Sequence, residues 1–193
     1  MPLRAVAVGT AFLAVLSAAT LASAQSVGNP VVVIETSVGN ITAELFQEEA
    51  PISVANFLSY VEDGFYSGTI FHRVIKGFMI QAGGMTPDMI RKDTKAPITN
   101  EATNGLGNER GTLAMARTAD VDSATAQFFV NTANNRSLNH RSTEQAQYGY
   151  AVFGKIIDGI DIVDQIENTA TGTAGPFRDV PTTPITIDAI RLQ

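Results

Sequence analysis

The amino-acid sequence predicts a single all-β dominated domain, in which an antiparallel sheet closes into a barrel or packs as a sandwich. Two observations carry this prediction: many short β-type segments are separated by turns, and just two segments have helical periodicity, without strand–helix alternation. The 193 residues, 45% of them apolar, suffice for one well-buried domain and are too few for two of ordinary size. We expect this domain to span residues 31–193.

Residues 1–24 have the composition of a Sec-type signal peptide. The single charge of this segment, Arg4, precedes a small and apolar run, and Ala22-Ser23-Ala24 offers small residues at both cleavage-determining positions. A run of this length could also anchor a protein in a membrane, but it is rich in Ala, Ser, Thr and Gly rather than Leu and Ile. We therefore expect cleavage after Ala24, a short leader over residues 25–30, export with the periplasm as destination, and no stable membrane insertion afterwards.

The first part of the domain is predicted to be a β-hairpin followed by a short helix. A β-branched strand over residues 31–35, a Gly-containing turn over 37–40 and an alternating strand over 41–46 form the hairpin. From Pro51 the apolar residues recur at helical spacing, and Gly64 follows the last of them. The apolar face of this helix consists of Val54, Phe57, Leu58 and Val61.

The remainder of the domain alternates strands with loops and contains one more helix. Apolar runs at residues 70–75 and 78–82 precede a polar stretch, 83–111, which is dense in Gly, Pro, Asn and Thr and is predicted to be a loop. A second helical pattern at Ile160, Val163 and Ile166 begins behind Asp158, a candidate N-cap. Further strands are expected at residues 112–116, 127–131, 150–156 and 185–192.

Composition excludes several classes of function. Once Arg4 is removed, 12 of the 13 basic residues stand against 19 acidic ones, so the mature net charge is −7 and nucleic acids are poor partners. The chain has no cysteine, which excludes disulfides, thiol catalysis and thiolate metal sites. No repeat or assembly helix is visible, so a monomer is expected.

The usual catalytic and cofactor motifs are missing. The sequence contains no GxSxG, HExxH, Walker or GxGxxG motif. The two histidines, His72 and His140, lack the local carboxylate partners of a metal site, and a structural or solvated role is expected. Asp120 and Asp122 suit a solvated turn better than a calcium loop, and Gly83-Gly84 suit a turn better than a phosphate cradle. We expect neither a cofactor nor a metal.

Two segments combine apolar side chains with strong hydrogen-bonding groups. In residues 71–81, alternation allows Arg73 and Gln81 to face a common pocket with Phe78 or Met79 nearby, and residues 127–129 form a second such cluster. On pattern alone the simpler interpretation is favoured, in which Phe78, Met79 and Phe129 are core and Arg73 is a surface charge.

The same segments carry a family resemblance. FHRVIKGFMIQAGG, residues 71–84, resembles the signature of the cyclophilin family, and further blocks follow in the family's order, so that the likeness covers roughly residues 30–192. Those blocks are residues 100–106, 110–117, 122–129 and 150–154. The resemblance implies a closed eight-stranded antiparallel β-barrel capped by two short helices, and peptidyl-prolyl cis-trans isomerase activity on proline-containing polypeptides.

The family's functional positions can be carried over residue by residue. The resemblance implies catalytic roles for Arg73 and Gln81 and substrate-binding roles for Phe78, Met79, Ala116, Arg117, Gln127, Phe129, Leu138 and Tyr150. Three positions depart from many eukaryotic relatives: Ser137 stands in place of a Trp, Tyr150 in place of a His, and Arg117 in place of an Asn. These departures bear on inhibitor and substrate preference, and weak cyclosporin binding is expected.

Two functional hypotheses remain. As an enzyme, the protein would use Arg73 to stabilise the twisted X-Pro amide, whose nitrogen becomes pyramidal and gains a lone pair. As a binding module or chaperone, it would hold proline-containing segments without turnover. The joint presence of Arg73, Gln81 and Phe129 favours the enzyme.

Overall fold

The computed structural model describes Met1 and residues 28–193. The predicted signal peptide, its cleavage site after Ala24 and residues 25–27 of the predicted leader lie outside the described residues. Within the described part of the chain, no helix is both long enough and apolar enough to cross a membrane.

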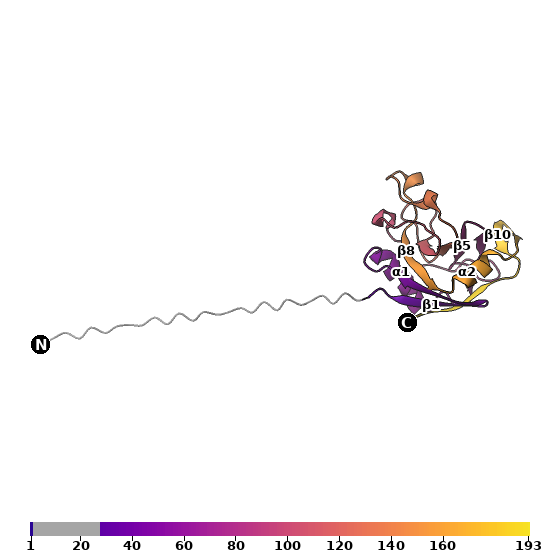
Figure 1. The fold of residues 1–193 in the computed structure, drawn as a ribbon, viewed down its shortest axis with the longest axis horizontal. Helices are drawn as coiled ribbons and strands as arrows, with labels where there is room; N and C mark the ends of the chain where they lie inside the picture. Colours follow the sequence, from indigo (N-terminus) through magenta and orange to yellow (C-terminus); the bar gives the residue numbers. More distant parts are fainter. Residues whose placement is uncertain (2–27) are drawn as a thin grey trace.

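Two sheets, two α-helices and three short 3-10 segments make up the domain (Figure 1). The larger sheet has nine strands in the order β3-β11-β1-β2-β8-β6-β7-β5-β4, and every pairing in it is antiparallel. Its strands are β1 (Val31–Thr36), β2 (Gly39–Leu45), β3 (Thr69–Ile70), β4 (Arg73–Ile75), β5 (Met79–Ala82), β6 (Thr112–Met115), β7 (Phe128–Asn131), β8 (Val152–Asp158) and β11 (Thr186–Leu192). The other elements are α1 (Pro51–Glu62), η1 (Ala102–Asn104), η2 (Arg136–Leu138), η3 (Gln145–Gln147), α2 (Ile160–Glu167), β9 (Thr171–Ala174) and β10 (Phe177–Pro181).

The two outermost strands of the large sheet, β3 and β4, are consecutive in the chain, so the sheet curls until its ends meet. The two residues between them share this connection, because the backbone N–H of Phe71 donates to Ile185 on one side and that of His72 donates to Gln81 on the other. Counted as one strand that changes partner at this point, β3 and β4 give the eight strands that the family resemblance implied. The prediction of an antiparallel barrel is confirmed. The apolar run over residues 70–75 did not reveal that this segment is divided into β3, which pairs with β11, and β4, which pairs with β5.

The barrel core follows the alternation of the strands. Val32 and Ile34 of β1 face inward and are fully buried, while the residues between them are partly exposed. At its centre lies Phe57 of α1, whose ring centroid is 5.2 to 5.4 Å from those of Tyr66, Phe128 and Phe153. The helix predicted from Pro51 therefore covers the barrel with an aromatic side chain pointing into it.

The helix ends are stabilised by residues that the sequence pattern did not identify. Pro51 occupies the first turn of α1 as predicted, and the Glu101 carboxylate accepts hydrogen bonds from the N–H groups of Ile52 (3.0 Å) and Ser53 (2.7 Å). The prediction of Asp158 as the N-cap of α2 is wrong. The cap is Gly159, at φ 78°, where a Cβ would collide with the backbone oxygen of Asn40.

The hairpin of β9 and β10 was not predicted. It forms a separate two-stranded sheet, and β10 packs against β4. The segment contains two Gly and three Thr among residues 169–175 and lacks a continuous apolar face, which explains why alternation did not reveal it. This hairpin places a second layer beside the strand that carries Arg73.

Candidate functional site

A row of four directly opposed residues crosses the outer face of the barrel. Arg73 of β4 pairs with Gln81 of β5, Gln81 pairs with Phe129 of β7, and Phe129 pairs with Ala114 of β6. Side chains at opposed positions leave a sheet on the same face. The structure therefore brings Arg73, Gln81 and Phe129 together from three strands.

Alternation decides which aromatic residue belongs to the site. Phe128 and Ile80 point into the barrel core, whereas their neighbours Phe129 and Met79 belong to a separate apolar cluster outside it. The buried members of this outer cluster are Met79, Ala114, Phe129 and Val152, and partly buried residues packed against it include Phe78, Ala116, Leu138 and Tyr150. All six apolar or aromatic residues predicted for substrate binding thus gather in one outer cluster. Met79 and Phe129 are buried, as the simpler interpretation expected, but in this cluster and not among the side chains that fill the barrel.

The cluster is fixed from beneath by asparagine side chains. The amide of Asn135, itself buried, donates to the backbone oxygen of Phe78 (2.7 Å) and to the side chain of Asn131 (2.7 Å). Asn108 donates to the backbone oxygens of Leu138 (3.2 Å) and Tyr150 (3.3 Å). Sequence reasoning missed these residues, because their role depends on contacts between loops distant in the chain.

Two glutamines lie beside the cluster and contact each other. Nε2 of Gln81 donates to Oε1 of Gln127 (2.9 Å), and the backbone N–H of Ala116 donates to the backbone oxygen of Gln127 (3.0 Å). Gly84 leaves the space that Gln127 occupies, since a Cβ on Gly84 would lie 2.5 Å from Cγ and Nε2 of Gln127. A cavity of about 320 Å³ opens here, lined among others by Gln81, Ala116, Arg117 and Gln127.

Arg73 lies at the edge of the row with its side chain about half exposed. Its exposed fraction is 45%, and its one ion pair among the described residues joins Nε to Oδ2 of Asp179 at 3.9 Å. The guanidinium is therefore accessible to a ligand that rests on the outer cluster. The pattern-based view of Arg73 as an exposed charge is right about exposure, but the charge lies beside an apolar surface.

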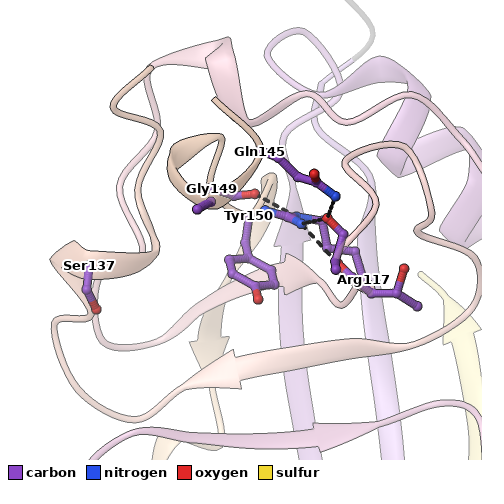
Figure 2. Close-up of a pocket in the computed structure, with 8 residues that line it drawn as sticks. Arg117, Ser137, Gln145, Gly149 and Tyr150 are labelled. Atoms are coloured by element: carbon purple, nitrogen blue, oxygen red, sulfur yellow. Dashed lines mark hydrogen bonds between the residues drawn. The ribbon is translucent and has the colours of Figure 1, made fainter. Parts of the chain in front are cut away.

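Arg117 and Tyr150 form another border of the site, and Arg117 also lines the cavity beside the two glutamines. Figure 2 shows the guanidinium of Arg117 over the ring of Tyr150, and its carbon lies 4.7 Å from the ring centroid. Nε donates to the backbone oxygen of Gly149 (3.0 Å), and Nη1 donates to those of Thr118 and Ala119. Within the described part of the chain, Arg117 takes part in no ion pair. A stacked cation without a carboxylate partner is thus fixed at this border.

A second and larger cavity, of about 620 Å³, opens beside this arginine. Its wall includes Arg117, Ser137, Gln145 and Tyr150 (Figure 2). Gln145 of η3 donates through Nε2 to the backbone oxygen of Ala119 (2.7 Å) and so ties one wall of the cavity to the other. Ser137, one of the three positions that depart from the family resemblance, lines the cavity without filling it. The tyrosine ring connects the cavity to the outer cluster, because it meets Phe129 edge to face at 5.7 Å.

The two histidines take up structural positions. His72 is buried, and burial, aided by the neighbouring cations Arg73 and Arg91, lowers the pKa of its imidazole to about 4. His140 lies against Tyr148, and its Nδ1 is 2.8 Å from the backbone oxygen of that residue.

Among residues 28–193, no three His, Asp or Glu side chains are grouped as metal ligands would be. Asp122 accepts a hydrogen bond from the backbone of Asn100 (2.8 Å), in keeping with a turn.

Comparisons with known proteins agree with this geometry. The family model described as cyclophilin type peptidyl-prolyl cis-trans isomerase/CLD matches residues 31–192. A peptidyl-prolyl cis-trans isomerase of Acinetobacter baylyi is 51% identical over 181 residues, covering 94% of this chain and 95% of the relative. Peptidyl-prolyl cis-trans isomerase B of Escherichia coli is 51% identical over 162 residues, covering 84% of this chain and 99% of the relative.

Solved structures resemble the whole domain. A cyclophilin type peptidyl-prolyl cis-trans isomerase of Cryptosporidium parvum superposes with a TM-score of 0.74 at 30% identity, covering 86% of this chain and 98% of that one. A second crystal structure of the same isomerase, in the presence of the dipeptide Ala-Pro, gives a TM-score of 0.72 at 30% identity, with coverages of 84% and 98%.

Proposed function

The chain belongs to the cyclophilin type peptidyl-prolyl cis-trans isomerase family, and on that premise we propose which of its residues accelerate rotation about X-Pro bonds, and on which substrates. The enzyme class follows from relatives that are about half identical over most of the chain and are named as such isomerases. One observation carries the assignment of residues: the row in which Arg73, Gln81 and Phe129 are opposed across three strands beside an apolar cluster.

Arg73 acts on the twisted amide. Resonance holds the X-Pro bond planar with a rotation barrier of about 18–20 kcal/mol, and twisting gives the prolyl nitrogen a pyramidal lone pair. A guanidinium N–H directed at that lone pair binds the twisted state more strongly than either planar isomer. The half-exposed guanidinium at the end of the row can make this contact without a nucleophile or proton exchange with solvent.

The transition-state stabilisation that the reaction requires can be supplied by one charged hydrogen bond together with substrate orientation. An acceleration of roughly four to five powers of ten requires about 6–7 kcal/mol. A single charged hydrogen bond supplies about half of this. We assign the rest to orientation of the substrate before it rotates.

The outer cluster supplies that orientation. Phe78, Met79, Phe129 and Leu138 hold the proline ring, while Gln81 and Gln127 hold the carbonyl side of the bond. Phe and Met side chains accept the ring through its apolar surface and make no contact that depends on the residue before proline. Broad X-Pro specificity follows from this part of the site.

Arg117 and Tyr150 bind the polypeptide on the far side of the proline ring. The edge-to-face contact of Tyr150 with Phe129 makes the two borders continuous, so a substrate chain leaving the cluster next meets Arg117 and the larger cavity. The uncompensated charge of Arg117 favours acidic or carbonyl-rich segments there.

The substrates are proline-containing polypeptides in the exported compartment, the periplasm. The composition of residues 1–24 supports export. The mature net charge of −7 argues against nucleic acids as partners. We further propose that the mature protein starts at Gln25 and acts as a monomer. Mass spectrometry of protein isolated from a periplasmic fraction, together with its mass in solution, tests both points.

The assigned mechanism is tested by exchange spectroscopy on an Ala-Pro peptide with the wild-type protein and Arg73→Ala in parallel. Wild-type protein should accelerate exchange and Arg73→Ala should lose nearly all of that acceleration while still binding the peptide. Full activity of Arg73→Ala would contradict the mechanism proposed for Arg73. A chaperone without turnover would bind the peptide with no acceleration in either form.

A further inference from the structure

Asp179 stands beside the guanidinium of Arg73, yet it belongs to neither the barrel nor the outer cluster. It lies on β10, in the small sheet that packs against β4. Its Oδ2 is 3.9 Å from Nε of Arg73, and the two side chains are exposed to the same degree, 44% and 45%. The distance is too long for a hydrogen bond, so the contact is an ion pair made side-on to the guanidinium.

A β-bulge produces this placement. Phe177 pairs with Ala174, but Val180 pairs with Gly172, so β10 contains one more residue than β9 over this stretch. Bulges of this kind redirect a side chain that regular alternation would point elsewhere. Here the redirected residue is the aspartate that meets Arg73.

The backbone of Asp179 is in an uncommon conformation. Its φ is 59°, and among the described residues Met89 is the one other non-glycine with a positive φ. This region is unfavourable for residues with a Cβ, although Asp and Asn tolerate it best. Backbone strain of this kind is held by its surroundings and gathers at functional sites.

We propose that Asp179 is a positioning residue for the isomerase reaction: the bulge directs its carboxylate to Nε of Arg73, which holds the guanidinium over the outer cluster and leaves its terminal nitrogens for the substrate. This inference rests on the proposed role of Arg73 as the donor to the prolyl nitrogen. A long arginine side chain has many rotamers, and a donor that must meet a short-lived twisted amide benefits from having few of them populated.

The test compares Asp179→Asn with wild-type protein. Asparagine has the same shape and tolerates positive φ, so this variant removes the charge and leaves the bulge. We expect kcat/KM on an Ala-Pro peptide to fall roughly twofold to fivefold, the range in which a partly exposed ion pair acts. The peptide Kd should stay within about twofold, since the outer cluster binds the proline ring. Asp179→Glu, which keeps the charge, should retain more activity than Asp179→Asn.

Two further variants exclude other causes. Glu35→Gln removes one negative charge from an ion pair with Arg191 on β1 and β11, and it should leave kcat/KM unchanged. Asp179→Gly relieves the positive φ, so it should be at least as stable as Asp179→Asn and equally slow. Unchanged or faster catalysis by Asp179→Asn would overturn the proposal, as would an equal loss in Glu35→Gln. If Arg73 is not the donor, Arg73→Ala will be active; if the positioning role alone fails, Arg73→Ala will be inactive and Asp179→Asn fully active.

Discussion

Arg73 and Gln81 are directly opposed partners on β4 and β5, and both side chains leave the barrel on its outer face. They lie eight residues apart in the chain, so the tight connection between the two strands is enough to place them together. The charge and the amide at the edge of the apolar cluster are therefore fixed by a local hairpin, and the apolar residues join them from more distant strands.

Arg73→Lys tests the geometry of the proposed donor separately from its charge. Lysine keeps the positive charge but loses the planar fork of donors. We expect kcat/KM to fall roughly a hundredfold, equivalent to about 2.7 kcal/mol of transition-state stabilisation, with peptide exchange as the measurement. Arg191→Lys, at an exposed arginine on β11, serves as control and should behave as wild type.

Phe129→Ala and Phe128→Ala form a matched pair, because the two phenylalanines are adjacent and point to opposite sides of β7. Phe128→Ala should lower the free energy of unfolding by about 3–5 kcal/mol through a cavity in the barrel core. Phe129→Ala should instead weaken peptide binding, with a smaller loss of stability. Denaturant unfolding and peptide titration separate the two effects, and an unchanged Kd in Phe129→Ala would contradict the placement of the proline ring.

Gly84→Ala is expected to lower activity at little cost in stability. The new methyl group would displace the side chain of Gln127, which is flexible and can move, and so break its contact with Gln81. Gly83→Ala is the contrasting variant. Its φ of 83° and its contact with a backbone oxygen make that change destabilising by about 1 kcal/mol or more. Exchange rates and unfolding curves of both variants check this prediction, which fails if Gly84→Ala retains full activity.

Arg117→Gln should change substrate preference rather than the rate for neutral peptides. Loss of the cation beside the larger cavity is expected to weaken binding of peptides with an acidic residue next to Ala-Pro by roughly threefold to tenfold. Peptides with glutamine at the same place should be affected less than twofold. Equal effects on both peptides, measured by titration, would show that the charge of Arg117 does not contact substrate.

The lowered pKa of the buried His72 is expected to make the free energy of unfolding depend on pH. Because the folded state holds the pKa near 4 and the unfolded chain near 6.5, the folded protein binds fewer protons between these values. The contribution of neutral His72 to stability is complete above about pH 6.5 and is lost as the pH falls to about 4, by about 3 kcal/mol in total. Urea unfolding from pH 4 to pH 7.5 measures this slope. His72→Gln should remove this slope.

Much of the fold could be predicted because it depends on local periodicity. Alternation identified β1, β2, β6, β7, β8 and β11 to within one or two residues, and helical spacing identified α1 and α2. The predictions failed where tertiary contacts determine the ends and pairing of an element. The chain changes strand partner at Phe71 and His72, and Gly159 caps α2 because it passes close to Asn40. No pattern within one segment contains that information.

The sequence by itself determined the barrel class, the two helices and, through the ordered family blocks, the residues of the outer cluster. It could not decide that Phe129 faces outward and Phe128 inward, because alternation gives two faces without saying which one is the core. The tertiary structure decided this by closing the sheet around Phe57. It also brought Asp179 to Arg73 from more than one hundred positions away, a contact that arises from packing between two sheets and leaves no periodic signal in the chain.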